Sequence, residues 1–392
     1  MTTSLPRRAE RPLRVLIAYS YSMHYRRGVF EALLAMPDLD VTIAAGRTPS
    51  GTQGRGSAQV APINPTDLPA MQWHQTWSLG SLRFQPGLLR RSLSSRYDVV
   101  IWDPSMHCLT MWASAAVLRA RGRTVLFWGL GWTHTHGVIK EKLKVGGFRL
   151  AHAFLTYGQR SAERAEAGGY PPGRLYIVGN SISDSPGAEA VAARGLPAPD
   201  PLVLGLALRL TDRKRVDLLI RAVASLGRRG ERTRAIVVGD GPARAELEAL
   251  RDQLGADVIF TGSLYDDAAI ARFYEQIHLT VIPGHAGLTV TSSLMHGRPV
   301  ITHDNPDHHA AEWEAIRDGV TGAFFAEGDE DDLVRAIMGL RDRLVVGPEA
   351  RREIAAQCRA DYLQHGEPSA HAARIVAAAQ DVIVQRFQLA SP

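Results

Sequence analysis

The chain has 392 residues, 45% of them hydrophobic, and a formal net charge of +5. This length and apolar content suffice for two buried cores, and the charge is too low for a nucleic-acid coat but favours anionic ligands such as phosphates. We expect no signal peptide, because the apolar run at 13–19 is only strand-sized, and no stretch approaches a membrane span. Cys108 and Cys358 lie far apart and are expected to be reduced thiols, which predicts a cytoplasmic protein.

Short apolar runs alternate with helical segments in the first part of the chain. The runs are "LRVLIAYS", "DVTIAAG", "DVVIWDPS", "TVLFWGLG", "AHAFLTYG" and "RLYIVGNSI". Continuous apolar runs between helices are typical of a parallel sheet that is covered on both faces. We therefore predict a Rossmann-like domain over 1–182, with a mobile Gly-rich loop at 46–59. Residues 183–201 are rich in Ala, Pro and Gly without a sustained period, and we interpret them as a linker.

A second series of strands and helices follows the linker. Its predicted strands are "LVLGLALRL", "RAIVVGDG", "VIFTG", "LTVIPG", "RPVIT" and "TGAFF". They predict a second Rossmann-like domain over 202–365. A terminal helix within 366–392 has Ile375, Ala379 and Val382 at helical spacing, and we expect it to pack back on the first domain. The predicted fold class is α/β, with two doubly wound domains facing a cleft where open α/β sheets bind ligands.

Two cations follow the first strand of the second domain. Arg209 lies at the strand end, and Lys214 comes five residues later, just before a helix. A guanidinium, an ammonium and the free amides of a helix start together suit a diphosphate. The alternative is a solvated basic loop, since Arg213 and Arg215 are also cationic.

The segment "VVGDGPARAEL", residues 237–247, places a Gly-rich turn after the next strand. The P-loop pattern and the G-x-G-x-x-G spacing are both absent. We interpret this segment as a tight turn, in which Asp240 caps a helix opened by Pro242.

The stretch "IPGHAGLTVTSSLMHGRPVIT", residues 282–302, is a strand, a Gly-rich loop, a helix and another strand. Gly284 and Gly287 allow the backbone to approach a ligand closely, and the helix start attracts an anion. Short hydroxyl side chains can bond to a sugar or a phosphate without crowding it. The alternative is that they cap the helix or bond to backbone, as Thr291 and Ser293 can do.

With these segments in place, the second domain resembles a GT-B glycosyltransferase similar to glycosyltransferase family 4. The matching segments, in the family's order, are "LRLTDRKRVDLLIRA", "AIVVGDGPARAELEAL", "VIFTGSL", "FYEQIHLTVIPG", "GLTVTSSLMHGRPVIT" and "EAIRDGVTGAFF". The first domain resembles the family only in its pattern. The resemblance implies retaining transfer of a sugar from a UDP- or GDP-type nucleotide sugar to an acceptor hydroxyl, with no obligatory cofactor.

The resemblance also implies the roles of individual residues. Arg209 and Lys214 would hold the donor's diphosphate, and His285 and Glu312 would complete the catalytic group. The remaining donor-binding candidates are Gly239, Ser263, Leu264, Gly284, Gly287, Leu288, Thr289, Ser292, His309 and Glu314. The acceptor-side candidates are His24, Arg26, His134 and His136.

The chain departs from the family at its acidic pair. The family usually carries two glutamates separated by seven residues, and Gly284 and Ser292 stand at those places. The sequence resembles a subgroup with a His-rich stretch and a double acid further on, here "HDNPDHHAAEWEAIRDG". Ser292 is then expected to contact the ribose, and His285, His309 or Glu312 to assist at the sugar. A neutral His can donate to a sugar hydroxyl or a phosphate.

Two other patterns have ordinary structural explanations. Asp329 and Asp331 have a carboxylate spacing seen in metal-dependent transferases of another fold, but they precede a helix and are expected to cap it. We therefore predict no metal site. Trp73 and Trp77 could stack on an acceptor, although aromatic residues near a long loop are usually core.

Two other functions compete with glycosyl transfer. A sugar-nucleotide epimerase of the same architecture would act on the donor alone, and a catalytically silent binding or scaffold protein would explain the missing acids. The Ala- and Arg-rich composition suggests a bacterial enzyme of cell-surface glycan or secondary-metabolite synthesis. Expected partners are the nucleotide sugar and a hydroxyl-bearing acceptor, with no nucleic acid and with peripheral contact to the inner membrane face left open; the oligomeric state is unreadable from the sequence.

Overall fold

The computed structural model describes residues 11–47, 63, 66–132 and 137–390. The chain forms two compact units. Unit 1 comprises residues 1–179 and 368–392, and unit 2 comprises residues 180–367. Most of the predicted mobile loop at 46–59 lies outside the described residues.

A seven-stranded parallel sheet forms the centre of unit 1, in the order β3-β2-β1-β6-β7-β8-β9. Its strands are β1 (Leu13–Tyr19), β2 (Leu39–Gly46), β3 (Gln72–His74), β6 (Val99–Trp102), β7 (Thr124–Gly129), β8 (Ala153–Thr156) and β9 (Leu175–Ile177). A separate antiparallel hairpin joins β4 (Trp77–Leu79) to β5 (Leu82–Phe84). The sequence predicted the parallel sheet but neither β3 nor this hairpin.

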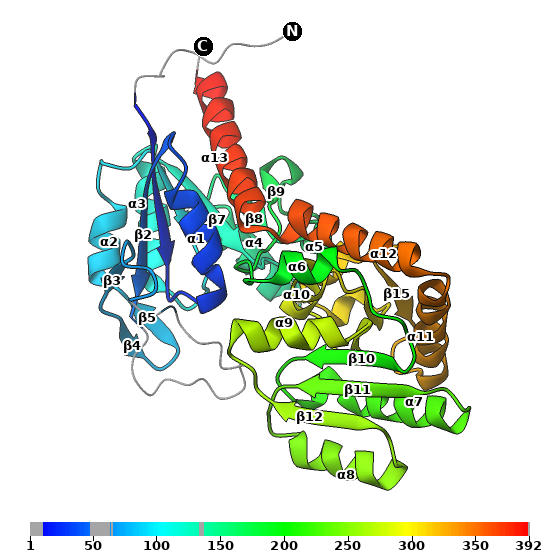
Figure 1. Ribbon diagram of the computed structural model, residues 1–392. Coiled ribbons are helices and arrows are strands. Elements are labelled where there is room, and N and C mark those ends of the chain that lie inside the picture. Colours follow the sequence, from blue (N-terminus) through cyan, green and yellow to red (C-terminus); the bar gives the residue numbers. More distant parts are fainter. Residues whose placement is uncertain (1–10, 48–62, 64–65, 133–136, 391–392) are drawn as a thin grey trace. The chain divides into compact units, whose positions relative to one another are not determined.

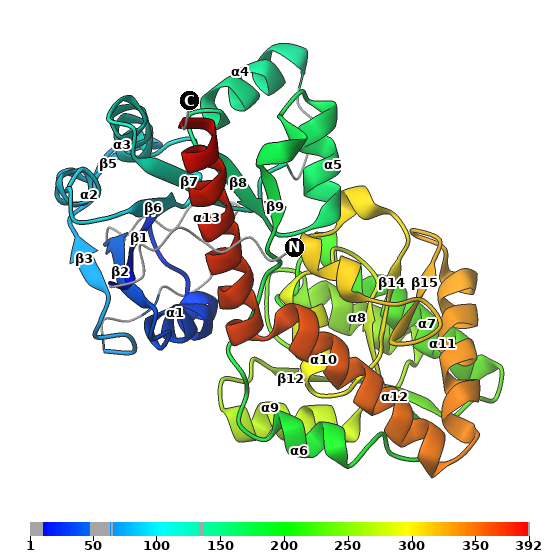
Figure 2. The same ribbon diagram turned by 90° about the horizontal axis from the view of Figure 1, so that it is seen from above.

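Helices cover both faces of this sheet (Figures 1 and 2). They are α1 (Arg27–Leu34), α2 (Pro86–Ser92), α3 (Leu109–Ala120), α4 (Val138–Phe148), α5 (Gln159–Ala167) and α13 (Pro368–Ala390). Alternate residues of β1 point to opposite faces. Leu16 and Ala18 join the core with α2 and α3, whereas Val15 and Ile17 lie with residues of α1 and α13. This two-sided burial explains why the strand is apolar throughout.

The C-terminal helix α13 packs on unit 1, as the sequence predicted. Its buried stripe includes Ile375, Ala379 and Val382. At two further places it bonds to the unit's backbone: Arg374 Nε donates to the Val178 carbonyl at 2.7 Å, and Arg386 donates to the Gly122 carbonyl at 2.8 Å. The last helix of the chain is therefore part of the first unit's core.

Unit 2 is built on a six-stranded parallel sheet in the order β12-β11-β10-β13-β14-β15. The strands are β10 (Leu202–Ala207), β11 (Thr233–Val238), β12 (Val258–Gly262), β13 (Leu279–Ile282), β14 (Val300–His303) and β15 (Gly322–Phe325). These are the six strands that the sequence predicted for this domain.

The helices of unit 2 also lie on both faces of its sheet (Figure 1). They are α6 (Ala188–Ala193), α7 (Val216–Arg228), α8 (Arg244–Leu254), α9 (Asp267–Gln276), α10 (Leu288–Met295), α11 (Glu330–Val345) and α12 (Pro348–Asp361). The predicted linker at 183–201 contains α6, which differs from the prediction. Ala188, Val191 and Ala192 bury this short helix in unit 2, where it contacts α9 and α12.

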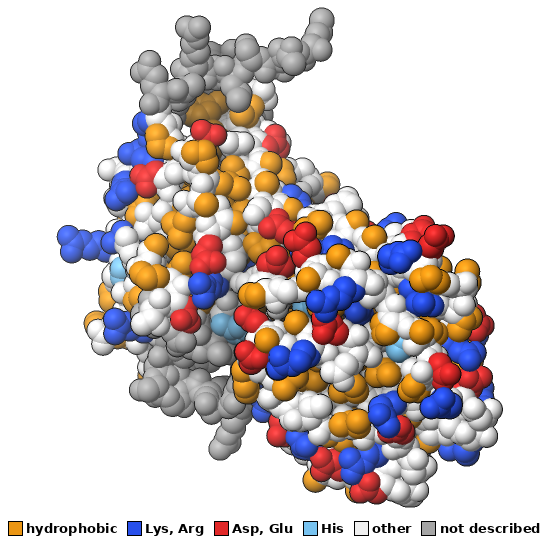
Figure 3. Space-filling view, viewed as in Figure 1, with side chains coloured by type: hydrophobic (Ala, Val, Ile, Leu, Met, Phe, Trp, Pro, Cys, Tyr) orange, Lys and Arg blue, Asp and Glu red, His pale blue; other side chains and the backbone are white. Residues whose placement is uncertain are grey.

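Other sequence-based expectations concern surface and buried groups. Cys108 and Cys358 are both free and buried, as predicted. Trp77 is 56% exposed, so the core interpretation is wrong for that residue. On the face of unit 2 seen in Figure 3, basic and acidic side chains are interspersed. Of the helices in the described part of the chain, none is both long and apolar enough to cross a bilayer.

The docking of α13 gives the first prediction. Ile375 is 1% exposed, so Ile375→Ala should lower the free energy of unfolding of unit 1 by about 3 kcal/mol. Gln380→Ala, on the exposed side of the same helix, should change it by less than about 0.5 kcal/mol. Urea unfolding followed by tryptophan fluorescence checks this, because Trp313 is the only tryptophan outside unit 1. Equal effects of the two substitutions would contradict a buried α13.

Candidate functional site

The strand order of unit 2 reverses between β10 and β13, which lie next to each other although they are far apart in sequence. Ligands of open α/β sheets bind at such a switch point, beyond the carboxyl ends of the strands. The loops that leave this point are 208–215 after β10 and 283–287 after β13. They contain the cations and glycines that the sequence singled out.

Arg209 is the first cation beyond β10. Its side chain is exposed, and no carboxylate pairs with it among the described residues, although many other arginines of the chain are paired. An exposed, unpaired guanidinium at a ligand-binding edge is available to an anion.

Lys214 ends a short 3-10 turn, Asp212–Lys214, and reaches across to the loop after β13. Its Nζ donates to the His285 carbonyl oxygen at 2.7 Å and lies 3.4 Å from His285 Nδ1. Burial lowers the pKa of Lys214 to about 8, helped by the nearby charge of Arg213 and opposed by Glu312. The ammonium is thus held in place, and a bound anion would restore its ordinary affinity for a proton.

Gly284 makes this crossing possible. A Cβ at Gly284 would lie 2.3 Å from the Arg213 carbonyl oxygen and 2.6 Å from the carbonyl carbon of Lys214. Gly239 is similar, because its φ is +134° and a Cβ there would lie 1.9 Å from the Leu208 carbonyl oxygen. Gly284 was expected to admit a ligand, and Gly239 was a donor-binding candidate in a segment interpreted as a tight turn. The structure shows that both glycines admit a neighbouring protein loop.

The imidazole of His285 is neutral. Burial, together with the charges of Lys214 and Arg213, lowers its pKa to about 3. An ammonium can only donate, so the contact with Lys214 leaves Nδ1 as the acceptor and places the ring proton on Nε2. His285 therefore offers one N–H donor and no charge at this edge.

Two of the four hydroxyl side chains of α10, Thr289 and Ser293, hold the helix to the sheet. Thr289 Oγ1 donates to the Ala207 carbonyl at 2.9 Å, at the end of β10. Ser293 is buried and bonds Thr280 at 2.6 Å and the Arg298 carbonyl at 2.8 Å. Thr291 is also buried. The alternative that these side chains bond protein groups is therefore confirmed for Thr289 and Ser293.

Ser292 has a different environment. It is only half-buried, and its hydroxyl accepts a hydrogen bond from Tyr274 at 3.0 Å. Tyr274 is itself stacked on His296, with ring centroids 4.0 Å apart. Ser292 keeps its own proton to donate, so a ligand hydroxyl remains a possible partner.

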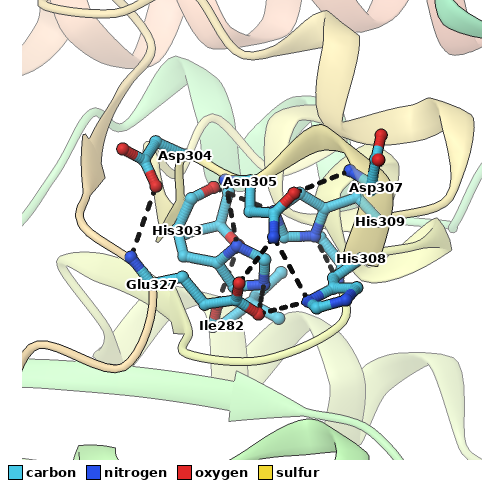
Figure 4. Close-up of polar contacts among 10 residues, drawn as sticks. Ile282, His303, Asp304, Asn305, Asp307, His308, His309 and Glu327 are labelled. Atoms are coloured by element: carbon cyan, nitrogen blue, oxygen red, sulfur yellow. Dashed lines mark hydrogen bonds and ion pairs between the residues drawn. The ribbon is translucent and has the colours of Figure 1, made fainter.

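The His-rich stretch after β14 forms a network around Glu327, which follows β15 (Figure 4). His308 Nδ1 lies 2.5 Å from one oxygen of Glu327, and Asn305 donates to the other at 2.6 Å. Despite partial burial, these bonds lower the pKa of Glu327. His303 stacks on His309 with centroids 3.9 Å apart. The network fixes the path of the chain between β14 and the double acid.

His309 links this network to the loop before α10. Its Nδ1 accepts from the Ala286 backbone amide at 3.0 Å, and its Nε2 lies 2.8 Å from the His303 carbonyl oxygen (Figure 4). Both ring nitrogens are therefore used by backbone groups. The expectation that His309 touches the sugar does not fit this geometry, and His309 instead positions the loop that contains His285.

Glu312 is the buried member of the double acid that follows the His-rich stretch. It lies on the 3-10 turn Ala311–Ala315, which contacts α10, and it is 8% exposed. One carboxylate oxygen accepts from Asn180 at 2.5 Å, and the other is buried with no hydrogen-bond partner in the described residues. Glu314 lies on the same turn and is half-buried. A buried carboxylate oxygen without a donor is a site for a ligand hydroxyl.

The other donor-side candidates line the same carboxyl edge. Ser263 is exposed and Leu264 is half-buried beside the end of β12. Gly287 precedes α10 and has open space, since a Cβ would meet nothing closer than 3.9 Å. Leu288 begins α10 and is half-buried. The start of α10 is therefore open enough to receive an anion.

The acceptor-side candidates that the structure describes in unit 1 differ in their exposure. His24 is exposed beyond β1. Arg26 is 2% exposed, bonds to Tyr157, and lies over the rings of Tyr25 and Trp128. The expectation that Arg26 lies at an open edge is therefore corrected, since its cation packs among aromatic faces. His134 and His136 lie outside the described residues.

The two capping predictions have opposite outcomes. Asp329 accepts from the Asp332 amide at 3.0 Å and caps α11, as predicted. Asp240 does not cap a helix, because α8 begins at Arg244 with Ala243 at its cap; its carboxylate bonds the Gly241 amide instead. Within the residues that the structure describes, no three His, Cys, Asp or Glu side chains form a metal-binding group.

Two residues that hold side chains of the site were given no role from the sequence. Asn180 holds Glu312, and Tyr274 holds Ser292. No local pattern marks either residue, because each partner is far away in the chain. Asn180 lies in the predicted run "RLYIVGNSI" and Tyr274 in the matching segment "FYEQIHLTVIPG", and these positions were the available signals.

Comparison with known proteins identifies the second unit. Residues 201–343 match the family described as "Glycosyl transferases group 1". The second unit carries a group 1 glycosyl transferase domain. The switch-point cations, the start of α10 and the double acid all lie within this match.

Curated relatives resemble the group 1 domain over part of their length. An alpha-D-kanosaminyltransferase of Streptomyces kanamyceticus is 29% identical over 160 residues, which cover 40% of this chain and 39% of the relative. A D-inositol 3-phosphate glycosyltransferase of Actinosynnema mirum is 31% identical over 185 residues, covering 44% and 42%. The chain thus aligns with less than half of each of these relatives.

Solved structures match nearly the whole chain. The Anabaena HepE protein in complex with UDP has a TM-score of 0.67 and 17% identity, over 94% of this chain and 100% of its own. The lipopolysaccharide outer core galactosyltransferase WaaB has a TM-score of 0.66 and 16% identity, over 94% and 99%. At this identity the likeness establishes the fold: the chain has the GT-B architecture that the sequence predicted.

The crossing of the two loops gives the second prediction. Gly284→Ala should lower the free energy of unfolding of the group 1 domain by roughly 1–3 kcal/mol, because the new methyl overlaps the Arg213 carbonyl oxygen. Gly287→Ala is the matched control, three residues on and without a close neighbour. Urea midpoints followed by circular dichroism compare the two. If Gly284→Ala were as stable as the control, the close crossing would be wrong.

Proposed function

We propose that the protein is a retaining glycosyltransferase that moves a sugar from a nucleoside-diphosphate sugar to a hydroxyl of an acceptor. UDP or GDP is the proposed nucleotide. The observation that carries the proposal is the cation pair at the β10–β13 switch point. Arg209 is exposed and has no ion pair among the described residues. Lys214 is held by its hydrogen bond to the His285 carbonyl oxygen, beside the open start of α10. This arrangement suits two adjacent phosphates.

Names of relatives support this class of donor. One relative is a GDP-mannose-dependent mannosyltransferase of Mycobacterium tuberculosis, 34% identical over 106 residues. Among the structures of the same fold, one contains UDP and another UDP and glucose. The printed names mention different nucleotides and sugars, so they support the class of reaction and leave the sugar open.

We assign each remaining donor contact to a protein group that can form a further hydrogen bond. We assign the ribose to Ser292, which keeps a proton to donate. The nucleobase is assigned to the backbone of Ser263 and Leu264 beyond β12. Glu312, with its unpartnered oxygen, is assigned to a hydroxyl of the transferred sugar. His285 Nε2–H is assigned to the leaving phosphate.

The proposed chemistry needs no protein base. The bond from sugar C1 to the β-phosphate oxygen breaks, and the bond from C1 to the acceptor oxygen forms on the same face. The acceptor proton passes to the departing diphosphate. The protein has to position the partners and to stabilise the negative charge that develops on the leaving group. Arg209, Lys214 and neutral His285 do this without the acidic pair of the family.

The third prediction tests donor binding. Incubation with a panel of UDP- and GDP-sugars, followed by calorimetry and by assay of free nucleoside diphosphate, should show binding and slow release of UDP or GDP. Arg209→Ala should weaken binding several-fold or more, because a charge-assisted contact to phosphate is lost. Arg221→Ala, an exposed arginine on α7, is the control and should leave the affinity unchanged.

The same experiment separates the competing functions. Interconversion of two nucleotide sugars without an acceptor would indicate an epimerase. Binding without any turnover across the panel and a set of acceptors would favour a scaffold. Binding of no nucleotide sugar would contradict the transferase, and an unchanged affinity in folded Arg209→Ala would remove Arg209 from the site.

A further inference from the structure

Unit 1 has a switch point of its own. In the order β3-β2-β1-β6-β7-β8-β9 the direction of winding reverses between β1 and β6. The carboxyl ends of these two strands are followed by Ser20 and Asp103. By the same rule that locates the site in unit 2, a ligand of unit 1 is expected at this edge.

Asp103 lies directly at this position. Its amide donates to the Ala18 carbonyl of β1 at 2.9 Å, which fixes the residue beside the end of that strand. The backbone of Ser20 also bonds its carboxylate. The side chain is surrounded by protein but keeps part of its surface exposed. No cation lies within ion-pairing distance of it among the described residues, unlike Asp98 at the other end of the same strand.

Burial raises the pKa of Asp103 to about 6, although the charges of Arg26 and Arg83 act in the opposite direction. The carboxylate is therefore ionised at neutral pH in a place where its charge is costly. A largely buried carboxylate without a cation beside it lowers the stability of a fold, and a ligand group that donates to it would offset that cost.

Arg83 provides a complementary group. It lies on β5, which bridges Cys108, and its guanidinium lies 4.9 Å from the ring of Tyr21. Its Nη1 is buried and has no hydrogen-bond partner in the part of the chain that the structure describes. The hydroxyl of Ser22, which is 1% exposed, also lacks a partner there. A donor and a hydroxyl without partners in the described residues thus accompany Asp103, whose carboxylate is bonded by the Ser20 backbone but by no cation.

We propose that Asp103 and Arg83 bind the acceptor through its hydroxyl groups, with Asp103 accepting from one hydroxyl and Arg83 donating to the same or a neighbouring one. A hydroxyl both donates and accepts, so a neutral polyol such as a sugar or a cyclitol satisfies both charged groups. A phosphate would satisfy Arg83 but would be repelled by Asp103. This inference rests on the proposed function only in calling the polyol an acceptor, because polyol binding to unit 1 is measurable without transfer.

The fourth prediction uses a defined set of polyols: myo-inositol and the methyl α-glycosides of glucose, galactose and mannose. Saturation-transfer NMR should detect binding of at least one of them to the full chain. Asp103→Asn keeps the shape of the side chain and removes its charge, and it should weaken that binding roughly ten-fold or more. Asp98→Asn makes the same chemical change at the other end of β6 and should leave polyol binding unchanged.

Thermal midpoints distinguish a binding role from a structural one. Asp103→Asn should keep or raise the midpoint, since it removes an unpaired charge. Asp98→Asn should lower it, since it removes the partner of Arg11 and Arg14. No binding of any of these polyols, equal binding to Asp103→Asn, or a lowered midpoint for Asp103→Asn would each overturn the inference. UDP binding in the same samples reports on unit 2, so its loss would count against the proposed function and not against this site.

Discussion

The contact between the Lys214 ammonium and the His285 carbonyl oxygen joins the loops that follow β10 and β13. Everything else at the donor edge depends on that contact. It requires Gly284, because any side chain there would overlap the backbone of the opposite loop. It fixes a cation at the switch point, determines which nitrogen of His285 has the proton, and places the start of α10 beside both. His309 supports the same loop from the other side through the Ala286 amide.

The charge at this edge differs from that expected of a family 4 relative. Gly284 and Ser292 stand where acids are usual, so the edge has two cations, a neutral imidazole and one buried acid, Glu312. Fewer negative charges near a diphosphate reduce repulsion, and Glu312 is then the acid that acts on the charge of Lys214. Without the acidic pair, fewer side chains are available to recognise the sugar. Asn180 donates to one oxygen of Glu312, and the other oxygen can accept a hydrogen bond from a sugar hydroxyl.

The sequence was sufficient for all strands of the second sheet, for most strands of the first and for their carboxyl edges, because apolar runs, glycines and cations at strand ends report local structure directly. It could not distinguish hydroxyls that bind a ligand from those that bind protein: the partner of Thr289 is the carbonyl of Ala207, 82 residues away. Burial of Arg26 among aromatic rings was equally unreadable, since its neighbours come from distant strands. The significance of Asp103 depends on the absence of a paired cation among the described residues, which only a fold reveals. The helix α6 was hidden by a composition typical of linkers.

Proton uptake on nucleotide binding tests the central claim. The claim is that Lys214 binds the diphosphate and that partial burial lowers its pKa in the free protein. Calorimetric titration with UDP at about pH 8, in buffers of different ionisation enthalpy, measures this uptake. The pKa of free Lys214 is about 8, so binding of an anion that raises it should take up as much as about half a proton. Lys214→Arg keeps the charge but does not titrate in this range, and it should show no uptake. Uptake that is absent in the natural protein, or equal in the variant, would contradict the account.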